Sequence, residues 1–89
     1  MDLTDFRNQI DDIDKDIVSL FIRRMEIAAQ VAEYKRVNHL PIQVPAREQE
    51  ILHRLSGIAG AEMEAYVCEL YAEIFKLSRD YQSMKNSKA

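Results

Sequence analysis

Two cationic side chains interrupt an apolar helical stripe in the first half of the sequence. Apolar residues recur at alternating three- and four-residue steps from Leu3 to Leu20, and the next step lands on Arg24. Lys35 follows eleven residues later, within about 20° of the same helix face and about three turns along it. A charge in such a stripe costs desolvation energy unless it is paired. Arg24 and Lys35 are therefore spaced to hold a small anion between them.

Arg7 is a third cation, but it cannot join that site within one straight helix. It precedes Arg24 by seventeen residues, which places it about 25 Å away along the axis and about 100° around it. In an intertwined dimer, Arg7 would instead reach the site of the other copy.

Four polar residues later in the chain also suit an anion site. Arg47 and Glu48 are adjacent, and Ser78 and Gln82 lie four residues apart on the edge of a helical stripe. Each of these residues, like Arg24 and Lys35, has a plain structural alternative. Basic side chains usually extend into solvent, a glutamate suits the first turn of a helix, and Ser78 and Gln82 are often only the polar edge of an apolar stripe. The joint pattern indicates a site, whereas no single position does.

The first of three helical segments positions Arg7, Arg24 and Lys35. We expect it to begin near Thr4, a plausible N-cap, because an acidic residue follows. No Gly or Pro occurs before Pro41, so we expect the helix to continue to about Asn38.

Two further helices are expected to supply the remaining candidates. The second begins at Pro45, which suits a first helical turn, and ends at Gly57 as its C-cap. The third follows the break between Gly57 and Gly60, and its stripe of alternating steps starts at Met63. The polar tail, residues 85–89, is expected to fray.

The length of the first helix predicts a dimer. Residues 4–37 would span roughly 50 Å as a helix, whereas a compact chain of 89 residues has a diameter of about 30 Å. The overhanging part keeps its apolar stripe, and a second copy is the simplest cover. We therefore predict an all-α, intertwined homodimer of three-helix chains. A bent first helix in a monomeric bundle is less favoured, because the segment contains no helix breaker.

The composition indicates one domain, residues 1–89, and excludes several classes of protein. Two Gly and two Pro leave too few turns for a β-sandwich. The single cysteine cannot form an internal disulfide and suits the reducing cytoplasm, where we expect the protein. One Cys and two distant His make no structural zinc site. A net charge of -3 gives no reason to bind nucleic acid, and no apolar run is long enough for a membrane span.

Six short stretches together resemble the all-helical chorismate mutases. Their order and spacing are more specific than any stretch alone, and the resemblance extends from Leu3 to Gln82. It implies an intertwined homodimer with two active sites that rearranges chorismate to prephenate in aromatic amino-acid biosynthesis, with no metal or cofactor. The stretches are residues 6–14, 23–28, 31–35, 41–42, 47–48, and Ser78 with Gln82.

The resemblance implies that three arginines bind the substrate. Arg24 and Arg7 of the partner subunit would hold the two carboxylates of chorismate, since guanidinium groups stay charged and bind carboxylates bidentately. Arg47 would add positive charge beside them.

The resemblance implies that the other residues contact the reacting part of the substrate. Lys35 and Gln82 would donate hydrogen bonds to the ether oxygen, Glu48 would accept one from the ring hydroxyl, and Ser78 would line the site. This chain departs from the pattern at Val44, where many relatives carry an acidic residue. We expect weaker substrate affinity from Val44, but the same reaction.

Two other functions remain open at the level of sequence. One is an isochorismate pyruvate lyase on the same scaffold, against which Ser78 and Glu48 favour the mutase. The other is a non-catalytic helical dimerisation module, which would not need Arg7, Arg24 and Lys35 together. The sequence also leaves open a free-standing enzyme or a part of a fusion with prephenate dehydratase or dehydrogenase.

Overall fold

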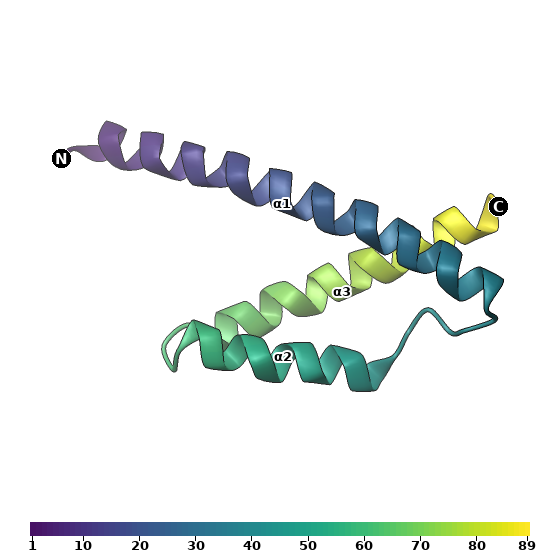
Figure 1. Ribbon diagram of the computed structural model, residues 1–89. Helices are drawn as coiled ribbons and strands as arrows, with labels where there is room; N and C mark the ends of the chain where they lie inside the picture. The colour runs from purple at the N-terminus through teal and green to yellow at the C-terminus, as the bar shows by residue number, and fades with distance from the viewer.

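Three α-helices make up the fold, and only the third contacts both of the others. The computed structural model describes residues 1–89, with α1 at Leu3–Val37, α2 at Pro45–Ala59 and α3 at Glu64–Ser87. Helix α3 packs against both α1 and α2. Figure 1 shows that the C-terminal part of α1 crosses the C-terminal part of α3, while the N-terminal half of α1 extends away from the other two helices. The predicted all-α class with a long first helix is confirmed.

The first helix begins and ends with recognisable capping interactions. Asp2 is the N-cap, its carboxylate accepts from the Asp5 N–H at 3.0 Å, and the Asp5 carboxylate accepts from the Asp2 N–H at 3.1 Å. The predicted N-cap, Thr4, is wrong, because the reciprocal hydrogen bonds of Asp2 and Asp5 place the N-cap two residues earlier. At the other end His39 adopts φ 57°, and the Leu40 N–H donates to the Lys35 carbonyl at 2.8 Å. The predicted end near Asn38 is confirmed.

The second helix starts where the sequence predicts but ends later. Pro45 occupies its first turn, as expected. The predicted C-cap, Gly57, is wrong, because the helix continues to Ala59 and Gly60 takes the positive φ of 81°. A glycine inside a helix costs only about 1 kcal/mol relative to alanine, so Gly57 does not stop the helix by itself.

The third helix extends further into the polar tail than the sequence predicts. It remains helical to Ser87, so the predicted fraying of residues 85–89 is wrong for most of that segment. The Asn86 side chain donates to the Ala32 carbonyl of α1 at 3.2 Å, which fastens the end of α3. Such a tertiary contact outweighs the weak local preferences of the tail.

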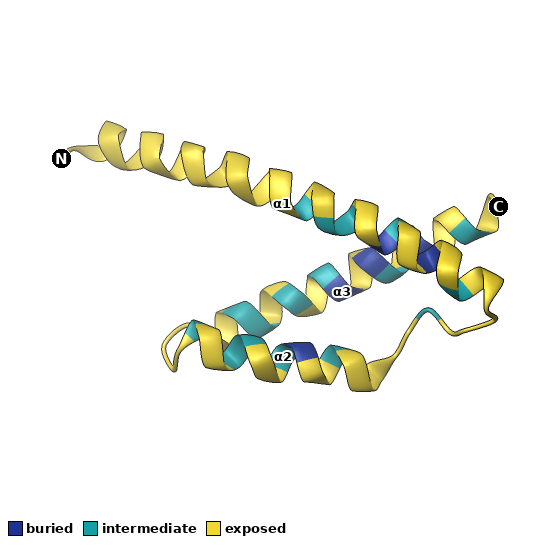
Figure 2. Ribbon diagram, viewed as in Figure 1, coloured by how far each residue is buried: buried dark blue, intermediate teal, exposed yellow.

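The core is small and lies where α1 crosses α3. Six residues are buried: Ala28, Ala32, Ile51, Phe75, Ser78 and Gln82. Two small alanines on α1 allow that helix to approach α3 closely. Figure 2 shows the buried positions of α1 and α3 around this crossing, whereas Ile51 is buried on α2. The N-terminal half of α1 is exposed throughout.

The N-terminal half of α1 presents an uncovered apolar stripe. Residues 1–20 are all exposed, and the side chains of the stripe between Phe6 and Leu20 are 50–63% accessible. The chain measures 54 × 28 × 14 Å and its radius of gyration is 16.2 Å, well above the value of about 12 Å for a compact chain of this length. The alternative of a bent first helix in a monomeric bundle is therefore wrong. No helix of the chain is both long enough and apolar enough to cross a membrane.

Candidate active site

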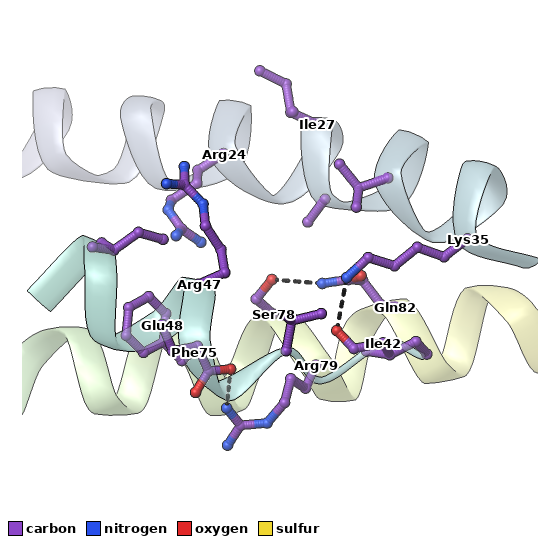
Figure 3. Close-up of a pocket in the computed structure, with 14 residues that line it drawn as sticks. Arg24, Ile27, Lys35, Ile42, Arg47, Glu48, Phe75, Ser78, Arg79 and Gln82 are labelled. Atoms are coloured by element: carbon purple, nitrogen blue, oxygen red, sulfur yellow. Dashed lines mark hydrogen bonds and ion pairs between the residues drawn. The ribbon is translucent and has the colours of Figure 1, made fainter. Parts of the chain in front are cut away.

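All three helices and the α1–α2 connection line one cavity of about 500 Å³. Figure 3 shows the lining side chains, which come from the three helices and the α1–α2 connection. Seven of the eight site residues predicted from the sequence line this cavity. They are Arg24, Lys35, Val44, Arg47, Glu48, Ser78 and Gln82.

The eighth predicted residue, Arg7, lies outside the cavity. It is exposed on the overhanging half of α1, about 25 Å along the helix from Arg24. One chain therefore assembles the other seven residues without it.

The charged side chains of the cavity give it a strongly cationic lining. Arg24, Lys35, Arg47 and Arg79 contribute four positive charges, and Glu48 contributes the only carboxylate. None of the four ion pairs in the structure includes Arg24 or Lys35. In a partly buried place, an unpaired cation attracts an anion more strongly than it does in bulk water. The cavity thus suits a small molecule with more than one negative charge.

Aromatic rings of α3 orient Arg24. Its guanidinium carbon lies 5.9 Å from the Tyr71 ring centroid and 5.8 Å from that of Phe75. These are cation–π distances, and the two rings pack edge to face with centroids 5.9 Å apart. Because the rings occupy no hydrogen-bonding capacity, the N–H groups of Arg24 remain available to a ligand.

A turn of the backbone orients Lys35 at the other end of the cavity. Lys35 Nζ donates to the Ile42 carbonyl at 2.9 Å. The left-handed conformation of His39 reverses the chain after α1 and allows this contact. An ammonium group has three N–H donors, so Lys35 retains two for a ligand. In Figure 3, Lys35 and Gln82 lie at the end of the cavity opposite to Arg24.

Ser78 and Gln82 form a buried polar pair on α3. Gln82 Nε2 lies 3.0 Å from Ser78 Oγ, and both residues are 7% exposed. Gln82 Oε1 has no hydrogen-bond partner. A buried acceptor that lacks a partner is costly, which suggests a role beyond the fold alone. The amide nitrogen has two N–H groups and uses one for Ser78, so it retains one that can donate to a ligand.

Glu48 and Arg47 are adjacent residues of α2, and their side chains make different contacts. Glu48 Oε2 accepts from Arg79 Nη1 at 2.6 Å, and this pair is partly buried. Arg47 instead pairs at 2.6 Å with Glu50 on its own helix, and both of these side chains are more than half exposed. An exposed pair of this kind is weak, so Arg47 can exchange it readily for a ligand.

Val44 is the N-cap of α2 and provides no side-chain cap. Its side chain lines the cavity at 37% exposure. Val44 therefore presents an apolar group to the cavity and offers no side-chain acceptor there.

Comparisons with known proteins agree with the resemblance seen in the sequence. Residues 6–83 match the family described as chorismate mutase type II. The chain belongs to the chorismate mutase type II family. No solved structure gives a significant match.

Individual relatives of this chorismate mutase type II chain are mostly longer proteins. A bifunctional chorismate mutase/prephenate dehydratase of Aquifex aeolicus is 39% identical over 78 residues, which cover 82% of this chain and 22% of that protein. A T-protein of Enterobacter agglomerans is 45% identical over 51 residues, covering 57% and 14%. A chorismate mutase of Methanocaldococcus jannaschii is 40% identical over 53 residues, covering 60% and 54%. The chain thus spans from about a seventh to about half of these relatives.

The sequence pattern of this chorismate mutase type II chain did not reveal every cavity residue. Arg79 and the Ile42 carbonyl contact predicted site residues, and Tyr71 and Phe75 orient Arg24. Arg79 carried one signal, because it lies three residues before Gln82 and so on the same helix face. The other contacts depend on tertiary packing. No three His, Cys, Asp or Glu side chains lie together as a metal site would require.

Proposed function

We propose that this chain is a chorismate mutase, which rearranges chorismate to prephenate in aromatic amino-acid biosynthesis. The observation that carries the proposal is the cavity in which Arg24 and Lys35 face a ligand space without a carboxylate partner. Chorismate is a dianion, so it suits a lining with four cations and one carboxylate. Membership of the chorismate mutase type II family supports the same substrate.

The arginines bind and fold the substrate. Arg24 and Arg47 on one chain, with Arg7 of the partner subunit, hold the two carboxylates through charge-assisted hydrogen bonds. The reaction is intramolecular, and its two reacting carbons must lie close together in a compact conformation of chorismate. Clamping both carboxylates limits the substrate to that conformation, which lowers the entropic part of the barrier.

Lys35 and Gln82 stabilise the breaking bond. In the rearrangement the ether C–O bond breaks while a C–C bond forms between the enolpyruvyl group and the ring. Negative charge develops on the ether oxygen, and N–H donors aimed at it act more strongly in the transition state than in the ground state. Lys35 Nζ keeps free N–H groups beside its bond to Ile42, and Gln82 supplies an amide from α3. The chemistry requires no nucleophile and no cofactor.

The hydroxyl end of the substrate meets fewer groups than in many relatives. Glu48 accepts a hydrogen bond from the ring hydroxyl, and Ser78 lines the site beside it. Val44 offers no acceptor, so we propose weaker binding in the ground state, with the rearrangement itself unchanged.

We propose that the active form is an intertwined homodimer, with residues 1–89 as a single domain. The support is the apolar stripe between Phe6 and Leu20, which no part of the chain covers. A second copy laid against this stripe would bury it, and would also bring Arg7 to the other cavity. A cytoplasmic location is part of the proposal, because the one cysteine, Cys68, is a free thiol.

Prephenate formation by the purified chain tests the proposal. We expect chorismate consumption to be matched by prephenate, and Lys35→Ala to lower kcat by about 100- to 1000-fold. Arg36→Ala is the matched control, because Arg36 is the next residue but forms only an exposed pair with Glu33. Pyruvate release from isochorismate without prephenate would indicate the lyase instead, and no turnover of either substrate would indicate a dimerisation module.

A further inference from the structure

One ion pair in the structure differs from the other three. Arg79 on α3 donates to Glu48 on α2, and its side chain and that of Glu48 are 29% and 22% exposed. The other pairs each join residues three or four apart on one helix, with side chains 42–70% exposed. Because solvent screens the Arg79–Glu48 pair less, it constrains the side chains more than the surface pairs do.

One oxygen of the Glu48 carboxylate, Oε1, remains available to a ligand beside the Arg79–Glu48 contact. Arg79 Nη1 approaches Oε2 at 2.6 Å, and no hydrogen bond to Oε1 is formed within the chain. In the view of Figure 3, Arg79 lies below the Glu48 carboxylate, while Arg24 and Arg47 lie above it. A carboxylate has acceptor capacity for several N–H or O–H donors, so Oε1 can still accept from a ligand.

Glu48 needs such a constraint in this chain. It is the only carboxylate that lines the cavity, and Val44 supplies no second acceptor. Without a partner, the Glu48 side chain is free to adopt other rotamers, in which its carboxylate no longer meets the ring hydroxyl. The ion pair with Arg79 holds one rotamer, from the side away from Arg24 and Arg47.

We propose that Arg79 is a positioning residue that holds Glu48 ready to accept a hydrogen bond from the ring hydroxyl of chorismate. It thereby gives the site its preference for a hydroxylated ligand. This inference rests on the proposed function, and it adds a residue whose effect passes through Glu48. Arg79 itself does not touch the reacting atoms.

A comparison of two ligands separates this role from a structural one. The variants are Arg79→Gln, Arg79→Lys, Glu48→Gln and the double variant Glu48→Gln/Arg79→Gln. Lys76→Gln is the matched control, because it breaks an exposed pair with Asp80 on the same helix. For each we would measure kcat and KM for chorismate, and the inhibition constant of a chorismate analogue with hydrogen in place of the ring hydroxyl. Thermal melts check folding.

We expect Arg79→Gln to raise the KM for chorismate about tenfold, the factor that corresponds to about 1.4 kcal/mol. Its kcat and its inhibition constant for the analogue should change less than about threefold, since the lost hydrogen bond concerns the hydroxyl alone, which the analogue lacks. Arg79→Lys should recover part of the loss. The double variant should be no worse than Glu48→Gln, because both changes remove the same interaction.

Two results would overturn the inference while leaving the proposed function in place. One is an Arg79→Gln variant that weakens chorismate and the analogue equally, which would mean that Arg79 only joins α2 to α3 or adds charge. The other is a double variant whose loss of chorismate affinity equals the sum of the losses of the two single variants, which would mean that Arg79 does not act through Glu48. If Arg79→Gln fails to fold, Arg79→Lys gives the same two-ligand comparison. A wild-type chain that forms no prephenate overturns the proposed function and this inference together.

Discussion

Replacing Gln82 with glutamate tests the side of the cavity that is proposed to face the breaking bond. Gln82 is 7% exposed, and the only hydrogen bond of its side chain within the chain is to Ser78. A glutamine amide donates without titrating, so this position adds no pH dependence to the wild-type protein. A glutamate in its place donates only when protonated. As a carboxylate it repels the negative charge that develops on the ether oxygen.

The size of the effect follows from the protonated fraction. A carboxyl group with the ordinary glutamate pKa of about 4.3 is about one-thousandth protonated at pH ~7.3. Burial raises the pKa of the new carboxyl, and the neighbouring cations lower it, so the midpoint of the profile measures their balance. Loss of one donor to a developing oxyanion costs about 100- to 1000-fold in rate. Activity of Gln82→Glu should therefore approach that of the wild type near pH 4 and fall to between about one-hundredth and one-thousandth of it at pH 8.

The assay is kcat/KM for chorismate from pH 4 to 9 on the wild type and on Gln82→Glu. Asn86→Asp is the matched control, because it also exchanges an amide for a carboxyl on α3. Asn86 donates to the Ala32 carbonyl outside the cavity, so we expect its variant to lose stability but to keep the shape of the wild-type profile. If Gln82→Glu and the wild type give profiles of the same shape, Gln82 does not contact the ether oxygen, and the assignment of this face of α3 is wrong.

Three further predictions concern affinity, stability and assembly. Val44→Asp should lower KM by about two- to tenfold, as a hydrogen bond worth about 0.5–1.5 kcal/mol would. Val44→Asn supplies a neutral acceptor and caps α2 equally well, so it shows whether the gain needs the charge; an unchanged KM in both variants would contradict the prediction. His39→Gly should raise the free energy of unfolding by up to about 1 kcal/mol, because His39 holds φ 57°; equal stabilisation by His39→Ala in denaturant titrations would show that the left-handed conformation is not the cause. Sedimentation equilibrium at micromolar concentration should give twice the chain mass of 10.4 kDa, and a compact, active monomer would refute the dimer.

The repeating pattern of the sequence predicts the long helix well. The uninterrupted apolar steps from Leu3 onward, with no breaker before Pro41, determine both the length of α1 and the overhang that the structure contains. The same periodicity identified Arg24 as a charge in an apolar stripe, and Arg24 indeed lines the cavity. These features depend on local spacing, which a sequence displays directly.

Helix ends were harder to predict, because neighbouring signals compete. Thr4 and Asp2 are both good N-caps, and only the reciprocal contact with Asp5 decides between them. Gly57 and Gly60 both resemble helix stops, and the one that takes a positive φ ends α2. Differences of about 1 kcal/mol decide such choices.

The contacts within the site depend on packing between helices, and the sequence could not reveal them. Arg79 resembles an ordinary surface arginine until α2 brings Glu48 beside it from 31 residues away. Likewise, Arg24 lies over Tyr71 and Phe75 only because α1 packs against α3. Residue types and spacing thus identified candidates for the cavity, whereas their partners required the fold.

Mixing two inactive variants tests most directly whether two subunits together complete each proposed chorismate mutase site. Arg7→Ala and Arg24→Ala should each be nearly inactive as homodimers. Refolded together in equal amounts, they should recover about a quarter of wild-type activity, because half of the dimers are mixed and each of these has one intact site. Mixing Arg24→Ala with Lys35→Ala, whose residues line the same chain's cavity, should recover none. Mixed Arg7→Ala and Arg24→Ala dimers that form but stay inactive would show that the two subunits do not share the site.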